Sequence, residues 1–61
     1  MRTIIKGTKT IEEYKSVKAT LEQEAMRRYE RNPEHGEPVT VYYSVDDVIV
    51  VEFADGTETR S

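Results

Sequence analysis

The sequence predicts an α+β fold of the order β-α-β-β(-β), with one long helix packed on one face of a small sheet that contains an antiparallel hairpin. Three patterns support this prediction. Apolar residues recur at helical spacing over residues 11–32, apolar and polar residues alternate over 39–44 and 48–54, and a β-branched run precedes the helix at 2–6. Sixty-one residues provide surface for one hydrophobic core, so we expect a single domain over residues 1–61.

The predicted helix has a recognisable start, end and core face. Thr10 and Glu13 have the spacing of a capping box, in which each side chain binds the backbone N–H of the other residue. Pro33 ends the helix, because proline disfavours helical geometry in the residue before it. At 100° per residue, the stripe expected to face the sheet consists of Ile11, Tyr14, Val17, Leu21, Ala25 and Tyr29.

The hairpin register follows from the requirement that paired residues lie on the same face of the sheet. A two-residue turn at Asp46-Asp47 would mix apolar and polar partners, whereas a three-residue loop over 45–47 does not. The resulting core pairs are Tyr43 with Ile49, Val41 with Val51 and Val39 with Phe53. Such a loop ends with a residue in the left-handed region, which Asp47 tolerates.

A second turn signal, Asp55-Gly56, suggests a type I′ turn that leads into a short edge strand at residues 57–60. The position of the first strand remains open at this point. A crossover through the helix could place it beside residues 39–43 or beside residues 48–53. These alternatives give the strand orders 1-2-3-4 and 1-3-2.

The face that the helix leaves uncovered is the expected interaction surface. Alternation places six residues there: Thr40, Tyr42, Ser44, Val48, Val50 and Glu52. Either Ile4 or Ile5 must join them, because neighbours in a strand point to opposite faces. We expect Tyr42 and Val50 to form the centre of this surface, buried in a homodimer or against another protein partner, with the polar residues around them.

Composition and charge restrict the functions that we consider. The chain has no cysteine, and its longest uncharged apolar run, Val48–Val51, is too short to span a membrane, so we expect a cytoplasmic protein. Residues 33–61 contain seven acidic residues and one basic residue. Arg27, Arg28 and Arg31, with Lys15 and Lys18, form a candidate nucleic-acid surface. Acidic residues in the helix balance these charges, so we do not expect nucleic-acid binding.

No residue pattern indicates catalysis, a cofactor or a metal. His35 is the single histidine, and no serine has the glycines of a nucleophile elbow, so we expect no enzyme. Topology places the loop around His35 beside the Asp55 turn, where Glu37 and Glu58 could also approach. These residues lack the spacing of a metal site, and the three glycines are too far apart to form a phosphate loop.

The leading hypothesis is a small non-enzymatic interaction protein that covers a site on another protein. In size, acidity and lack of motifs, the chain resembles in general style the accessory inhibitors and regulators that phages and other mobile elements encode. This resemblance is compositional and identifies no family. Two alternatives are an engineered domain whose outer-face residues serve folding or assembly alone, and a nucleic-acid-binding regulator.

Overall fold

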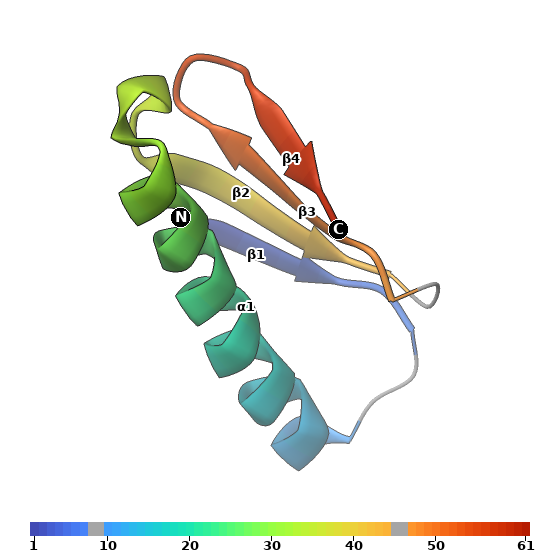
Figure 1. The fold of residues 1–61 in the computed structure, drawn as a ribbon. Helices are drawn as coiled ribbons and strands as arrows, with labels where there is room; N and C mark the ends of the chain where they lie inside the picture. Colours follow the sequence, from blue (N-terminus) through green and yellow to red (C-terminus); the bar gives the residue numbers. More distant parts are fainter. Residues whose placement is uncertain (8–9, 45–46) are drawn as a thin grey trace.

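The computed structural model describes residues 1–7, 10–44 and 47–61. Its elements in chain order are β1 (Arg2–Ile5), α1 (Ile11–Arg31), the 3-10 helix η1 (Pro33–His35), β2 (Pro38–Tyr43), β3 (Ile49–Phe53) and β4 (Glu58–Arg60). The predicted α+β class is confirmed, because one long helix packs on one face of a sheet that contains the β2–β3 hairpin (Figure 1). The helix ends at Arg31, one residue earlier than predicted.

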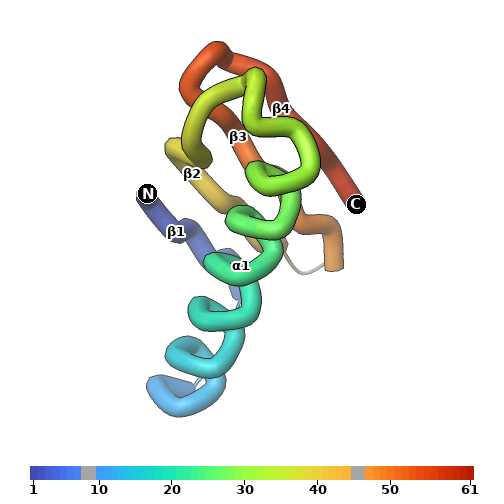
Figure 2. Tube along the Cα trace, turned by 60° about the vertical axis from the view of Figure 1, so that its left-hand side comes forward, coloured from blue at the N-terminus to red at the C-terminus, as the bar shows by residue number. Residues whose placement is uncertain are grey.

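The sheet has the strand order β1-β2-β3-β4, which decides between the two orders left open by the sequence. β1 pairs with β2 in parallel, whereas β2–β3 and β3–β4 are antiparallel. Parallel neighbours need a long connection, and α1 provides it between β1 and β2. α1 therefore packs mainly over these two strands, and in Figure 2 it lies in front of the sheet with β4 to one side.

The register of the first hairpin is confirmed for two of the three predicted core pairs. Val41 pairs with Val51, and Tyr43 pairs with Ile49. The third pair was wrong, because Pro38 and not Val39 stands opposite Phe53. A bulge between Pro38 and Thr40 inserts Val39 as an extra residue, and Val39 is 47% exposed.

The loops of the two hairpins close in the same way, with a residue of positive φ whose N–H donates to a carbonyl oxygen just before the loop. Asp47 has a φ of 62°, which places it in the left-handed region as predicted. Its N–H donates to the Ser44 carbonyl oxygen. Residues 45 and 46 of this predicted loop lie outside the described part of the chain. The predicted type I′ turn at Asp55-Gly56 was wrong. Only Gly56 there has a positive φ, and its N–H donates to the Phe53 carbonyl oxygen. Residues 54–56 therefore form a three-residue loop that closes with a left-handed glycine.

The core lies between the second half of α1 and the central strands. Its buried residues are Leu21, Ala25, Val41, Val51 and Phe53. Half-buried Val17 and Tyr29 pack against them, as the predicted stripe requires. Ile11 and Tyr14, however, are 75% and 40% exposed, so the first part of that prediction was wrong.

The first turns of α1 are exposed because the helix is longer than the strands that it covers. A helix of 21 residues is about 31 Å long, whereas strands of three to six residues span at most about 20 Å. Figure 1 shows the first turns of α1 extending away from the sheet. No helix in the described part of the chain is long and apolar enough to cross a membrane.

Candidate interaction surface

Two parallel rows of side chains cross the face of the sheet opposite α1, which we call the open face. The central row consists of Ile4 on β1, Tyr42 on β2, Val50 on β3 and Arg60 on β4. Each residue is the direct cross-strand partner of the next, so their side chains share one face. Ile4 therefore joins the predicted surface, while Ile5 packs against the core on the helix side.

The second row of the open face is polar. It consists of Arg2 on β1, Thr40 on β2, Glu52 on β3 and Glu58 on β4. Thr40 and Glu52 are direct cross-strand partners, as the register of the pair Val41 and Val51 requires. The row begins with a basic side chain at the β1 edge and ends with two acidic side chains over β3 and β4, so it carries a charge gradient across the sheet.

The remaining predicted residues, Ser44 and Val48, lie at the loop end of the hairpin. Together with Tyr42 and Val50 from the central row and Glu58 and Arg60 from β4, they line a hollow on the surface. Tyr42, Val48 and Val50 are each half-buried by their neighbours, and Glu52 is exposed. The structure thus brings all six predicted residues to one surface and adds Ile4, Arg2 and the β4 side chains to it.

The acidity of the second half of the chain is not concentrated on the open face. Among the eight residues of the two rows, two arginines balance two glutamates. Acidic residues outside the rows lie at η1 and at the hairpin turns, as with Glu34, Asp47 and Asp55. The open face therefore has no net charge that would select a strongly basic or strongly acidic partner.

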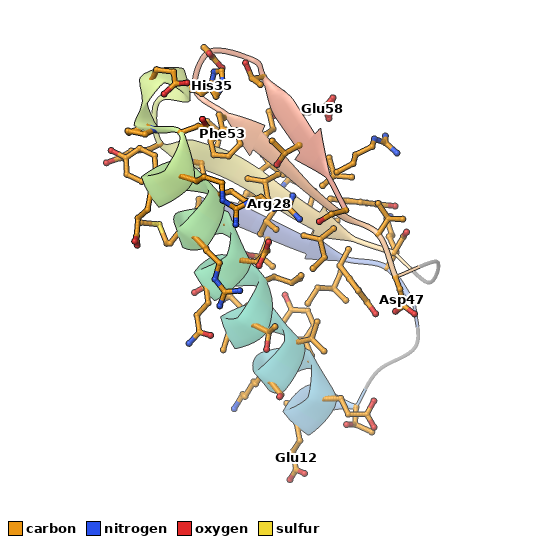
Figure 3. All side chains as sticks on the ribbon, viewed as in Figure 1. Glu12, Arg28, His35, Asp47, Phe53 and Glu58 are labelled. Atoms are coloured by element: carbon orange, nitrogen blue, oxygen red, sulfur yellow. The ribbon has the colours of Figure 1, made fainter. Side chains whose placement is uncertain are left out.

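A second polar cluster joins η1 to the β3–β4 turn (Figure 3). His35 Nδ1 lies 2.8 Å from Asp55 Oδ2 and 3.3 Å from Thr57 Oγ1, and the Thr57 N–H donates to Asp55 Oδ1 over 2.9 Å. The Thr57 backbone N–H, the Thr57 hydroxyl and His35 lower the pKa of Asp55 from 3.8 to about 2. These contacts hold the turn against η1, where the His35 and Phe53 rings lie 6.1 Å apart.

Of the four residues expected near this turn, only His35 and Asp55 bring their side chains together. Glu37 contributes its backbone carbonyl oxygen to the Ala54 N–H, and Glu58 belongs to the polar row of the open face. Within residues 1–7, 10–44 and 47–61, no group of three or more His, Cys, Asp or Glu residues could hold a metal ion. The cluster is thus explained by its structural contacts.

Arg28 is the residue that sequence reasoning misplaced most clearly. It is only 7% exposed, although it was assigned to the candidate nucleic-acid surface. Its Nε donates to Glu24 Oε1 over 3.0 Å, and its Nη1 and Nη2 contact β3, β4 and Ser61. Arg27 also forms an ion pair with Glu24, with its Nη1 3.5 Å from Glu24 Oε2. The spacing of Leu21, Ala25 and Arg28 was the available signal, since these residues share one helix face.

Comparison with known proteins gives no further assignment: no family model, no curated protein and no solved structure matches the chain. The open face offers apolar and aromatic contact area in its central row, and it carries charged side chains of both signs on β1, β3 and β4.

Proposed function

We propose that the chain is a small non-enzymatic protein-interaction module that binds another protein with its open face. The observation that carries this proposal is the row Ile4, Tyr42 and Val50, which runs across three neighbouring strands on the side that α1 does not cover. A two-layer α/β arrangement has only one interior, so apolar residues on the outer side gain their burial from a partner.

The composition of the open face matches that of a recognition surface. Tyr42 stands in the row between two aliphatic residues and combines a large apolar ring with a polar tip. Thr40, Ser44 and Glu52 lie around this centre and can form the polar rim that surrounds an apolar interface core. A module of this size would act by covering a site on the protein that it binds.

Capture experiments with matched variants test this proposal. The immobilised parent chain, Val50→Lys and Met26→Lys are compared on lysate from cells that produce the chain. Met26 is an exposed apolar residue on the helix, so its replacement makes the same chemical change away from the open face. Circular dichroism is used to check that each variant is folded, and Tyr42→Thr provides a second face variant with high strand propensity.

We expect one or more proteins, or the chain itself, to be retained by the parent and by Met26→Lys and lost with both face variants. A buried lysine without a partner loses its hydration, which opposes association. Binding should then be reproduced with the purified partner. Equal retention by all four folded baits would contradict the proposal.

A further inference from the structure

We infer that the protein covering the open face is a second copy of this chain, packed face to face about a twofold axis that runs parallel to the strands between β2 and β3. This inference rests on the proposed function and names its partner. An axis in this position exchanges β1 with β4 and β2 with β3 while it preserves the level of each row. Each row of one copy then lies over the same row of the other.

The central row is self-complementary under this operation. Tyr42 of one copy lies opposite Val50 of the second copy, and this contact occurs twice by symmetry. Val50 also lines the hollow on the open face, so the second copy's Tyr42 ring is directed toward that hollow. Ile4 lies opposite the second copy's Arg60, whose aliphatic stem can cover the isoleucine while its guanidinium remains in water.

The polar row is complementary in charge to the same row of the second copy. Its basic end, Arg2 on β1, lies opposite its acidic end, Glu58 on β4 of the second copy. Thr40 lies opposite the second copy's Glu52. Packed sheets cross at about 30°, which shifts their edges by a few ångströms, and the long arginine side chain spans such a shift. The charge gradient of one copy thus opposes the reversed gradient of the other.

An axis perpendicular to the strands produces poorer contacts. If it runs along the central row, it stacks Arg60 on Arg60 of the second copy. If it runs between the rows, it sets Glu52 on the second copy's Val50 and leaves a carboxylate on an apolar side chain. Like charges in contact and buried unpaired charges both oppose binding, so the axis parallel to the strands is favoured.

The size of the face sets the expected affinity. Four strands at about 4.8 Å spacing and five residues at about 3.3 Å give a face of roughly 19 by 17 Å. This footprint of roughly 320 Å² per copy is below that of most stable interfaces, so we expect a weak dimer with a dissociation constant on the order of 100 micromolar. Sedimentation velocity from about 1 μM to about 1 mM covers both sides of that value.

Charge-exchange variants test the axis directly. Arg2→Glu alone brings two carboxylates together at each of the two symmetric contacts of a homodimer, and Glu58→Arg alone brings two guanidinium groups together there. Each variant by itself should weaken association about tenfold or more. An equimolar mixture of the two restores an opposite-charge contact at both places in a heterodimer, so it should recover association close to that of the parent. Lys15→Glu and Glu12→Arg make the same charge changes on α1, and they should alter association little alone or together (Figure 3).

Association that is weakened in each variant and recovered in the mixture supports the second copy and the parallel axis. Association that the two charge variants leave unchanged, or that the mixture does not recover, overturns the inferred arrangement. A parent chain that stays monomeric throughout the range also overturns it, while leaving the proposed function to the capture experiment. Dimerisation that Val50→Lys leaves intact removes the open face from the dimer interface and overturns the inferred arrangement, while the proposed function is again decided by the capture experiment.

Discussion

Arg28 Nη1 donates to the carbonyl oxygen of Thr59 over 3.0 Å, which ties the last turn of α1 to β4. The same nitrogen lies 3.2 Å from the Ile49 carbonyl oxygen, and Nη2 donates to the Ser61 hydroxyl. α1 packs mainly over β1 and β2, and this guanidinium adds polar contacts from the helix to β3 and β4. Thr59 thus faces the helix side, and its neighbours Glu58 and Arg60 lie on the open face because side chains alternate along β4.

Arg28→Met should destabilise the fold by roughly 2–4 kcal/mol in urea unfolding, because it removes the buried hydrogen bonds to the Thr59 and Ile49 carbonyl oxygens and the ion pair with Glu24. Hydrogen exchange should locate the effect. The Ser61 N–H donates to Ile49, so this amide should exchange faster as β4 loosens. Arg27→Met is the matched control, since the Arg27 side chain is 68% exposed and should change stability by less than about 0.5 kcal/mol. Equal losses in the two variants would contradict the role assigned to Arg28.

Leu21→Ala should cost roughly 2–5 kcal/mol, because Leu21 is fully buried in the core. Ile11→Ala lies on the same helix stripe and removes a similar side chain, but it should cost less than about 0.5 kcal/mol because Ile11 is exposed. Urea unfolding of both variants measures the difference. If Leu21→Ala shows no folded baseline, Leu21→Val gives a smaller loss that can be measured. A costly Ile11→Ala change would show that the first turns pack more tightly than described.

Thr10→Ala should lower stability by about 1 kcal/mol, because the Thr10 Oγ1 accepts the Glu13 N–H over 3.1 Å at the start of α1. The reciprocal bond from the Glu13 carboxylate is not seen among the described residues, so only one half of the predicted capping box is present. Thr20→Ala is the control, since its hydroxyl only bonds back to the Ser16 carbonyl oxygen within the helix. Thermal melts should give a lower midpoint for Thr10→Ala than for Thr20→Ala, and identical midpoints would contradict the cap.

The sequence predicted the features that depend on local periodicity and pairing. Alternation assigned Thr40, Tyr42 and Val50 to the open face because a strand has a side-chain period of two. The rule that paired residues share a face predicted the pairs Val41 with Val51 and Tyr43 with Ile49. The start of α1 followed from its capping residue.

Features that depend on tertiary geometry were not predictable. Helical periodicity predicts a stripe but not where the sheet stops, so Ile11 was assigned to the core although it extends beyond it. The bulge at Val39 depends on how the chain enters β2 after η1. Arg28 was assigned to the surface by its charge, because its acceptors on β3 and β4 are 21 and 31 residues away in sequence. The strand order, which creates the two rows of the open face, likewise had no local signal.

Asp55 makes the stability of the β3–β4 turn depend on pH. Its folded pKa of about 2 lies below the ordinary value of 3.8, mainly because the Thr57 N–H binds the carboxylate, with the Thr57 hydroxyl and His35 adding to this effect. Because the pKa of Asp55 is lower in the folded state, its ionised carboxylate stabilises the fold fully at pH values above the unfolded-state pKa. This stabilisation is lost as the pH falls from about 4 to about 2.

We therefore expect the parent to be more stable than Asp55→Asn at pH 5, with the difference shrinking as the pH approaches 2. Urea midpoints at intervals between these values measure the difference, and the comparison removes the titration of other carboxylates that both proteins share. Glu34→Gln is the control, because Glu34 is exposed and forms no hydrogen bond or ion pair in the described part of the chain, so its curve should stay parallel to that of the parent. If the Asp55→Asn curve also stays parallel to the parent curve, the Thr57 and His35 contacts do not stabilise the ionised carboxylate, and the turn is held by its backbone bonds alone.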